Sequence, residues 1–219
     1  MTEINDLFDL NKTIASHIFS GKKYPWEILD EIGAFILALG ATLPENEFNH
    51  PADGVWIAKD ARIAPTACIG APCIIDHGAE VRHCAFVREN AIVGKNTVIG
   101  NSTELKNVII FDDAQVPHYN YVGDSVLGWK SHMGAGAVTS NVKSDYSDVV
   151  IREPECFHET HRMKVGAFLG DKAEIGCNSV LNPGTVVCRN SNVYPTSCVR
   201  GVVPENRIYK NRDHVVSKQ

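Results

Sequence analysis

The chain has 219 residues, of which 44% are hydrophobic and 21% charged, and its formal net charge is −5 at neutral pH. This composition is typical of a folded globular protein and excludes a disordered chain. The negative charge disfavours a broad nucleic-acid surface, and no apolar run reaches the length of a membrane-spanning helix. The seven cysteines are an odd number and the N-terminus lacks a secretory signal pattern, so we expect reduced thiols in a cytoplasmic protein.

The first 45 residues are predicted to be a helical segment. Residues 3–19 and 25–39 each place apolar side chains at helical spacing. They predict a helical hairpin that covers the end of the following repeat, because repeat solenoids need covered ends. Packing against a neighbouring subunit is the alternative. Residues 41–54 are rich in Pro, Asn and Asp and are predicted to form a linker.

A large aliphatic residue recurs every six residues in the rest of the chain. The positions are Ile57, Ile63, Ile69, Ile75, Val81, Val87, Val93, Ile99 and Leu105, then Leu169, Ile175, Leu181, Val187, Val193 and Val199. A small residue follows most of them by four positions. Neither an α-helix nor an alternating strand has this period. It indicates the hexapeptide repeat of a mainly β, parallel β-helix over residues 55–204. The basic tail, residues 205–219, is predicted to leave the solenoid.

The six-residue period is lost between the two runs. Pro117 occupies the expected core position of its hexad, where a central strand does not tolerate proline, and residues 142–165 show no repeat. We expect loops here, because loops on rigid scaffolds carry functional groups. His118 is the natural general base, since histidine exchanges protons near neutral pH. A surface histidine without a role is the alternative.

Several runs of sequence resemble one family. They are PHYNYVGDSVLG (117–128), GAGAVTSN (134–141), KVGAFLGDKAEIGCNSVLNPG (164–184) and NSTELKNVII (101–110). They resemble the acetyltransferase domain of bifunctional sugar-1-phosphate uridylyltransferase/N-acetyltransferases, which act on glucosamine-1-phosphate, and the match covers roughly residues 55–204. The resemblance implies a left-handed β-helix, a homotrimer, and acetyl-CoA bound in a cleft between subunits.

The resemblance also implies a role for individual residues. His118 matches the base that accepts a proton from the attacking amine, Asn141 matches the residue that orients the amine and the acetyl group, and Ala135 offers its backbone N–H to the oxyanion. The expected acceptor-binding residues are Arg88, Lys106, Tyr121, Arg162 and Lys164. The expected cofactor-binding residues are Cys177, Arg207, Lys210 and Arg212. Solvated surface residues are the alternative for the basic side chains.

The sequence departs from the family pattern in three places. The segment before the repeat lacks the glycine-rich loop of a nucleotidylyltransferase domain, so we expect no pyrophosphorylase activity. An acidic run follows Lys143, where the family places lysines. The phosphate clamp is then rebuilt from Arg162 and Lys164, or the acceptor carries less negative charge. His132 replaces an asparagine, which leaves the acceptor open between an amine and a hydroxyl.

These observations leave three functions to compare. The leading one is an acetyl-CoA-dependent acetyltransferase acting on an amino sugar or sugar phosphate, without nucleic-acid or membrane partners. A non-catalytic scaffold that binds sugar phosphates or sugar nucleotides is the second. A zinc-dependent hydratase is the third, with His77 and His83 or His158 and His161 as ligand pairs. Successive hexads lie on different faces, so His77 and His83 do not converge, and no metal is predicted.

Overall fold

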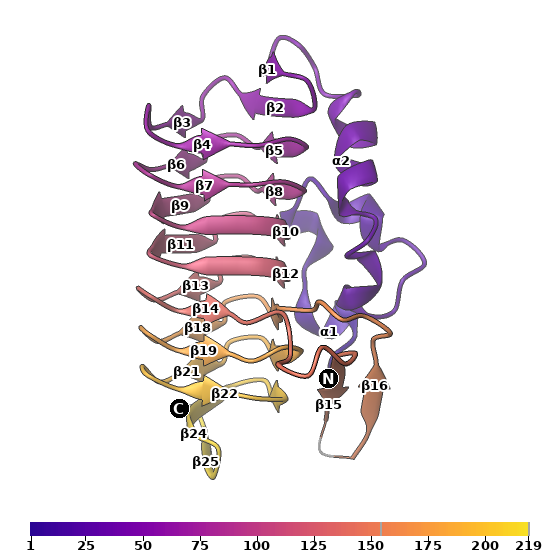
Figure 1. Ribbon diagram of the computed structural model, residues 1–219, viewed down its shortest axis with the longest axis vertical. Coiled ribbons are helices and arrows are strands. Elements are labelled where there is room, and N and C mark those ends of the chain that lie inside the picture. The colour runs from indigo at the N-terminus through magenta and orange to yellow at the C-terminus, as the bar shows by residue number, and fades with distance from the viewer. Residues whose placement is uncertain (154, 219) are drawn as a thin grey trace.

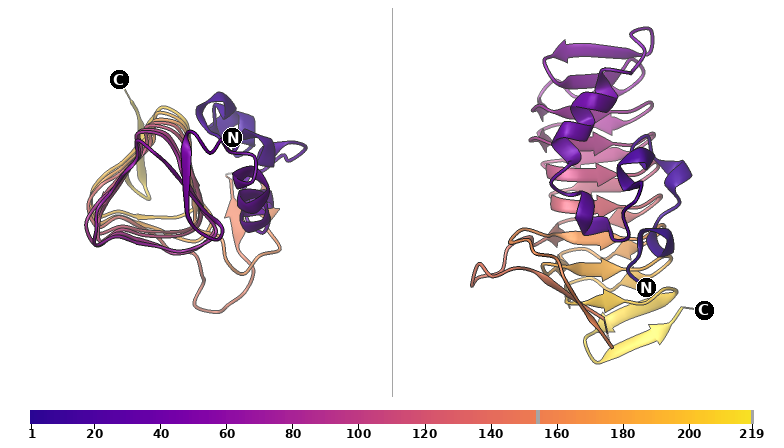
Figure 2. Two further views of the ribbon diagram at one scale, coloured as in Figure 1. Left: turned by 90° about the horizontal axis from the view of Figure 1, so that it is seen from above. Right: turned by 90° about the vertical axis from the view of Figure 1, so that its right-hand side faces the viewer.

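The computed structural model describes residues 1–153 and 155–218. It shows a parallel β-solenoid of triangular cross-section with the N-terminal segment along one side (Figures 1 and 2). Seen from the end of the solenoid where β2 lies (Figure 2, left), the chain turns anticlockwise as it recedes from the viewer, so the coil is left-handed. The predicted fold class is therefore confirmed. Among the described residues, no helix is long and apolar enough to cross a membrane.

Three faces make up the solenoid. Face 1 contains β4 (Cys68–Ile69), β7 (Phe86–Val87), the first halves of β10 (Glu104–Ile110) and β12 (Tyr121–Leu127), β14 (Val138–Thr139), β19 (Val180–Leu181) and β22 (Cys198–Val199). Face 2 contains β2 (Val55–Ala58), β5 (Cys73–Ile75), β8 (Ala91–Val93), the second halves of β10 and β12, β17 (Ala167–Leu169), β20 (Thr185–Val187) and β23 (Val202–Val203). Face 3 contains β3 (Arg62–Ile63), β6 (Glu80–Val81), β9 (Val98–Asn101), β11 (Gln115–His118), β13 (His132–Met133), β18 (Glu174–Ile175), β21 (Asn192–Val193) and β24 (Arg207–Asn211).

The aliphatic repeat positions fill the interior. Val87, Ile99 and Leu105 are fully buried there, as are most of the other repeat positions. Corners need residues that adopt positive φ, and Asn90 and Asn178 are examples of the asparagines found at them. The sequence repeat therefore encodes both the core and the corners.

The repeat is shifted, not lost, at Pro117. β10 pairs Glu104 with Tyr121, 17 residues later, whereas β5 pairs Cys73 with Ala91, 18 residues later. Because the coil is one residue shorter here, Val116 and not Pro117 points into the core. The expectation of a loop around His118 is wrong. Residues 142–165 do leave the coil, and they carry the hairpin of β15 (Val150–Arg152) and β16 (Phe157–Glu159).

The N-terminal segment covers face 2 instead of capping the end of the coil. It consists of α1 (Ile4–Leu7), 3-10 turns at Leu10–Lys12, Ser16–Phe19 and Pro25–Ile28, and α2 (Ile32–Gly40). The continuous helix predicted for residues 3–19 is therefore wrong. The face-2 strands point Ile74, Ile92 and Ile109 outward, and these side chains are fully buried under this segment. Covering that apolar surface is the physical reason for the placement.

The predicted linker and the predicted tail both contain strands. The linker at residues 41–54 includes β1 (Phe48–Ala52), which pairs antiparallel with β2. The predicted tail at 205–219 does not leave the solenoid, because β24 stacks on β21 and places Tyr209 inside the coil. β25 (His214–Ser217) then folds back antiparallel on β24.

Candidate active site

One edge of the solenoid, where face 3 turns into face 1, brings together three of the residues expected to act in catalysis or cofactor binding. His118 ends β11, while Ala135 and Cys177 follow β13 and β18 by two residues. Since β11, β13 and β18 are successive rungs, the three residues stand one coil apart, about 4.8 Å each. His118 and Cys177 are exposed and Ala135 is partly exposed. We call this line of residues the His118 edge.

Asn120 fixes the position of His118. Its buried side-chain oxygen accepts a hydrogen bond from the His118 N–H at 3.0 Å, and its amide nitrogen donates to the carbonyls of Gly134 and Ala137, both at 2.9 Å. The side chain thus ties the coil of His118 to the next coil. The sequence analysis gave Asn120 no role.

The backbone around Ala135 is suited to an oxyanion donor. Among the residues that the structure describes, no acceptor lies on the Ala135 N–H, while the neighbouring Gly136 N–H donates to the His118 carbonyl at 2.9 Å. A Cβ at Gly134 would lie 2.7 Å from the Cys177 nitrogen, so close stacking of these coils requires glycine. This N–H therefore lies one coil from His118.

The opposite edge of face 1 gathers three other predicted residues, Lys106, Tyr121 and Asn141, around Asp124. Asn141 donates to the Asp124 carboxylate at 2.5 Å and to the Tyr121 hydroxyl at 3.2 Å. Asn107 donates to the other Asp124 oxygen at 3.0 Å, and the Lys106 amine lies 3.8 Å from it. The Asp124 side chain is only 6% exposed. We call this group the Asp124 cluster.

Carboxylates already pair with two of the predicted acceptor-binding cations, Arg88 and Lys106. Arg88 donates to Glu104 at 3.0 Å and lies 3.5 Å from Glu89, and Lys106 faces Asp124. The hydrogen bond that Arg88 donates to Glu104 raises the pKa of Arg88. Burial and the charge of Asp124 raise the pKa of the Tyr121 phenol. From the sequence alone we did not identify Glu104 and Asp124 as partners of Arg88 and Lys106.

Arg162 uses its charge elsewhere. Its guanidinium pairs with Asp30 and donates to the Glu27 carbonyl at 3.5 Å, both in the N-terminal segment that covers face 2. The structure therefore does not bring it to the Asp124 cluster. Lys164 is exposed and its backbone bridges Val142, so its role stays a prediction.

The C-terminal hairpin extends the His118 edge. Lys210 and Arg212 line a hollow that also contains Pro195, which follows β21 as Cys177 follows β18. The Lys210 amine lies 5.6 Å from the centre of the Tyr194 ring. Arg207 instead pairs with the Ser217 hydroxyl within the hairpin.

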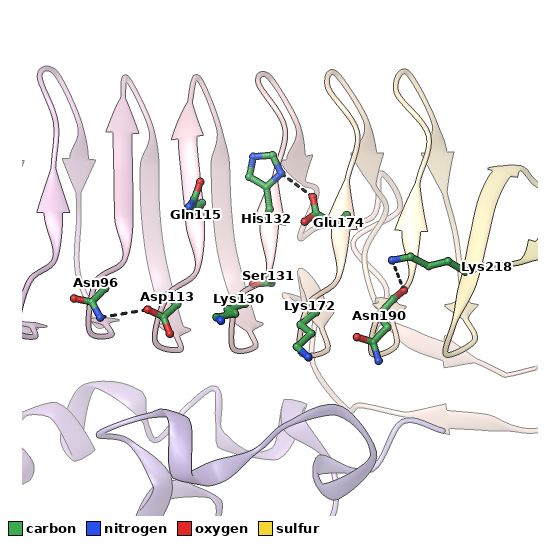
Figure 3. Close-up of a pocket in the computed structure, with 10 residues that line it drawn as sticks. All are labelled: Asn96, Asp113, Gln115, Lys130, Ser131, His132, Lys172, Glu174, Asn190 and Lys218. Atoms are coloured by element: carbon green, nitrogen blue, oxygen red, sulfur yellow. Dashed lines mark hydrogen bonds and ion pairs between the residues drawn. The ribbon is translucent and has the colours of Figure 1, made fainter.

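His132 lies on face 3, away from face 1. It bonds Glu174 at 2.9 Å in a hollow of about 730 Å³ (Figure 3). Lys130, Lys172 and Lys218 line the same hollow. The structure thus separates this histidine from the Asp124 cluster.

The histidine pairs considered for zinc do not form sites. His77 bonds Asp60 and His83 bonds Thr66, each at 2.9 Å, from different corners. The side chains of His158 and His161 are 18% and 79% exposed, respectively, and have different partners.

Comparisons with known proteins agree with this architecture. The GMPPB C-terminal domain family matches residues 69–160, which is less than half of the chain. A bifunctional sugar-1-phosphate nucleotidylyltransferase/acetyltransferase of Sulfurisphaera tokodaii is 30% identical over 49% of this chain and 27% of its own length. The bifunctional protein GlmU of Methanococcus maripaludis is 31% identical over 53% of this chain and 28% of its own. The chain thus spans about a quarter of the length of these relatives.

A structural match is weaker. Perosamine N-acetyltransferase of Caulobacter crescentus, solved with CoA and GDP-perosamine, covers 75% of this chain and 56% of its own at 13% identity, with a TM-score of 0.36. That score is too low to support an inference. The sequence matches and the coil together confirm the predicted resemblance: the chain carries a left-handed hexapeptide-repeat domain similar to part of the bifunctional sugar-1-phosphate nucleotidylyltransferase/acetyltransferases.

Proposed function

We propose that this protein is an acetyl-CoA-dependent acetyltransferase whose acceptor is an amino sugar or sugar phosphate. One observation supports this most directly: His118 and the Ala135 N–H, which has no acceptor among the described residues, stand one coil apart on one edge. A thioester is already activated, so transfer needs a base, an oxyanion donor and correct positioning. The His118 edge offers the first two.

His118 acts as general base in this proposal. It removes a proton from the acceptor amine as the nitrogen attacks the thioester carbon. The carbonyl electron pair moves onto oxygen, and the Ala135 N–H stabilises the resulting oxyanion. When that intermediate collapses, the C–S bond breaks and the coenzyme A sulfur takes the proton that His118 holds. The products are an N-acetyl sugar and free coenzyme A.

The acceptor lies across face 1 in this proposal. A strand segment of about three residues separates the two edges, which makes the face about 10 Å wide. An amino sugar fits within that width, with its nucleophile at the His118 edge and its other end at the Asp124 cluster. Tyr121 and Asn141 contact the ring. Because carboxylates occupy Arg88 and Lys106, an acceptor of low negative charge binds best.

Acetyl-CoA extends along the His118 edge. Cys177 and Pro195 continue this edge towards Lys210 and Arg212, which meet the cofactor phosphates. The homotrimer implied by the family resemblance places this edge beside a second copy of the chain. Light scattering during gel filtration measures the mass and tests the trimer, and a monomer would contradict it.

The experiment is a thiol-release screen with acetyl-CoA. The acceptors are glucosamine-1-phosphate, galactosamine-1-phosphate, their nucleotide-linked relatives and the unphosphorylated amino sugars. We expect acceptor-dependent release of one thiol per N-acetyl product. Absence of release with the whole panel, from protein that binds acetyl-CoA, would contradict the proposal.

A non-catalytic scaffold is the second candidate. The pairing of Arg88 and Lys106 with carboxylates favours it, because this pairing removes the free cations of a phosphate clamp. It predicts thermal stabilisation by a sugar ligand without any release of coenzyme A. The same panel, measured by thermal shift and by thiol release, separates the two functions.

A further inference from the structure

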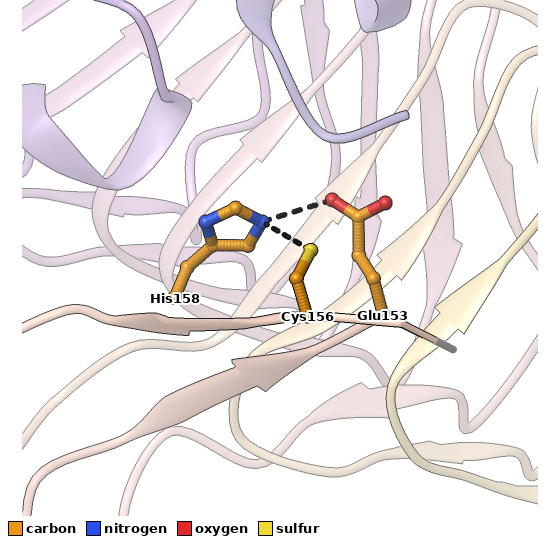
Figure 4. A group of neighbouring side chains, drawn as sticks. All are labelled: Glu153, Cys156 and His158. Atoms are coloured by element: carbon orange, nitrogen blue, oxygen red, sulfur yellow. Dashed lines mark hydrogen bonds and ion pairs between the residues drawn. The ribbon is translucent and has the colours of Figure 1, made fainter.

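The β15–β16 hairpin, which lies outside the coil, carries a second group of reactive side chains. The proposed reaction does not use them. Its base is anchored by Val149 and Ile151, which are fully buried beside the N-terminal segment. Near its turn, Glu153, Cys156 and His158 point towards one another (Figure 4). A buried base and a converging tip make this a preorganised cluster.

The distances in the cluster suit a small metal ion. The His158 Nε2 lies 3.5 Å from the Cys156 Sγ and 3.0 Å from a Glu153 carboxylate oxygen, and all three ligand atoms lie within 4.8 Å of one another. Tetrahedral zinc with ordinary bond lengths puts a sulfur and a nitrogen ligand about 3.6 Å apart, and a nitrogen and an oxygen about 3.3 Å apart. Small side-chain movements therefore suffice for coordination.

The donor set also selects the kind of metal. A thiolate, an imidazole and a carboxylate favour zinc or a similar borderline transition ion over magnesium or calcium. Two anionic ligands neutralise the divalent charge, and three protein ligands leave one position for water. We propose that Glu153, Cys156 and His158 form a binding site for a zinc-like divalent metal ion.

Neighbouring residues from the N-terminal segment support the ligands. The Thr2 hydroxyl donates to Glu153 at 2.6 Å, and the His158 ring packs 4.8 Å from the Tyr24 ring and 5.7 Å from the Trp26 ring. Such outer contacts orient metal ligands. The metal therefore fastens the hairpin turn at a point where it meets the N-terminal segment. From the sequence we considered His158 only as a partner of His161 and predicted no metal.

The test is a metal titration of the reduced full-length chain, first with Co²⁺ and then with Zn²⁺ as competitor. We expect one equivalent of Co²⁺ to bind with a thiolate-to-metal charge-transfer band and Zn²⁺ to displace it. Cys156→Ser should abolish the band, and His158→Gln should raise the Zn²⁺ dissociation constant at least ~10-fold.

Matched controls are Cys68→Ser and His161→Gln. Both residues are exposed, and His161 lies three residues after His158 in the same segment. These variants should bind both metals as the unmodified chain does. Absence of Co²⁺ and Zn²⁺ binding in the unmodified chain, or an unchanged charge-transfer band in Cys156→Ser, would overturn the proposal. Thermal melting without metal checks that each variant is folded.

Discussion

Replacing Asn120 with alanine should uncouple two coils of the candidate active site. The buried Asn120 side chain satisfies three backbone groups: the His118 N–H and the carbonyls of Gly134 and Ala137. Alanine leaves all three without this partner. At about 1 kcal/mol for each group, the free energy of unfolding should fall by about 3 kcal/mol. For a chain of this size, that corresponds to a melting temperature lower by about 6–12 °C.

Asn101→Ala is the matched control for this prediction. Asn101 occupies the same edge one coil earlier, but its amide donates to the His83 carbonyl in an exposed position, at 2.9 Å. We expect that variant to lose less than about 1 kcal/mol. Urea denaturation at one fixed protein concentration measures both. Equal losses in the two variants would refute the role given to Asn120. Looser placement of His118 should also lower kcat/KM of Asn120→Ala at least ~10-fold.

Three further predictions concern the scaffold. Ile92→Ala should lower the free energy of unfolding by about 3 kcal/mol in urea denaturation, because Ile92 is fully buried under the N-terminal segment. Val180→Ala, at a 37% exposed position, should lower it by less than about 1 kcal/mol, and equal losses would contradict the covering of face 2. Burial raises the pKa of the Asp76 carboxyl above its usual 3.8, so the protonated carboxyl stabilises the fold at low pH and this contribution is lost as the pH rises through the folded-state pKa. Asp76→Asn should flatten the pH dependence of the unfolding free energy, and an unchanged profile would contradict this. Burial raises the pKa values of the Cys73 and Cys188 thiols to about 12. A thiol reagent should therefore label the five exposed cysteines in the native protein, and Cys73 and Cys188 only after unfolding. Rapid labelling of all seven in the native protein would contradict the packing.

The six-residue repeat predicted the solenoid and its core because each hexad carries its own inward side chain. It failed beyond the corner at Asn107, where the coil is one residue shorter, so the register has already shifted by one at Pro117 while the coil continues. It also could not show what covers face 2. The signal was present as outward apolar residues such as Ile74 and Ile92, 18 positions apart and paired on adjacent coils. Reading it requires knowing that three hexads make one coil.

The sequence motifs predicted which residues lie in the candidate site. They did not predict which side chains pair with one another there. The spacing of His118 and Ala135 in the family-like runs corresponds to adjacent coils. The pairing of Arg88 with Glu104, and of Asn141 with Asp124, depends on contacts between coils, which single-sequence patterns do not show. The cluster of Glu153, Cys156 and His158 depends likewise on the antiparallel pairing of β15 with β16.

The central claim is that His118 transfers a proton during acetyl transfer. The most direct test compares kcat/KM of His118→Ala and His83→Ala on the best acceptor of the thiol-release screen, with folding checked by circular dichroism. His83 lies on the same edge two coils earlier and bonds Thr66. We expect a loss of about 10²–10⁴-fold for His118→Ala and less than about 3-fold for His83→Ala. Full activity of a folded His118→Ala variant would contradict it.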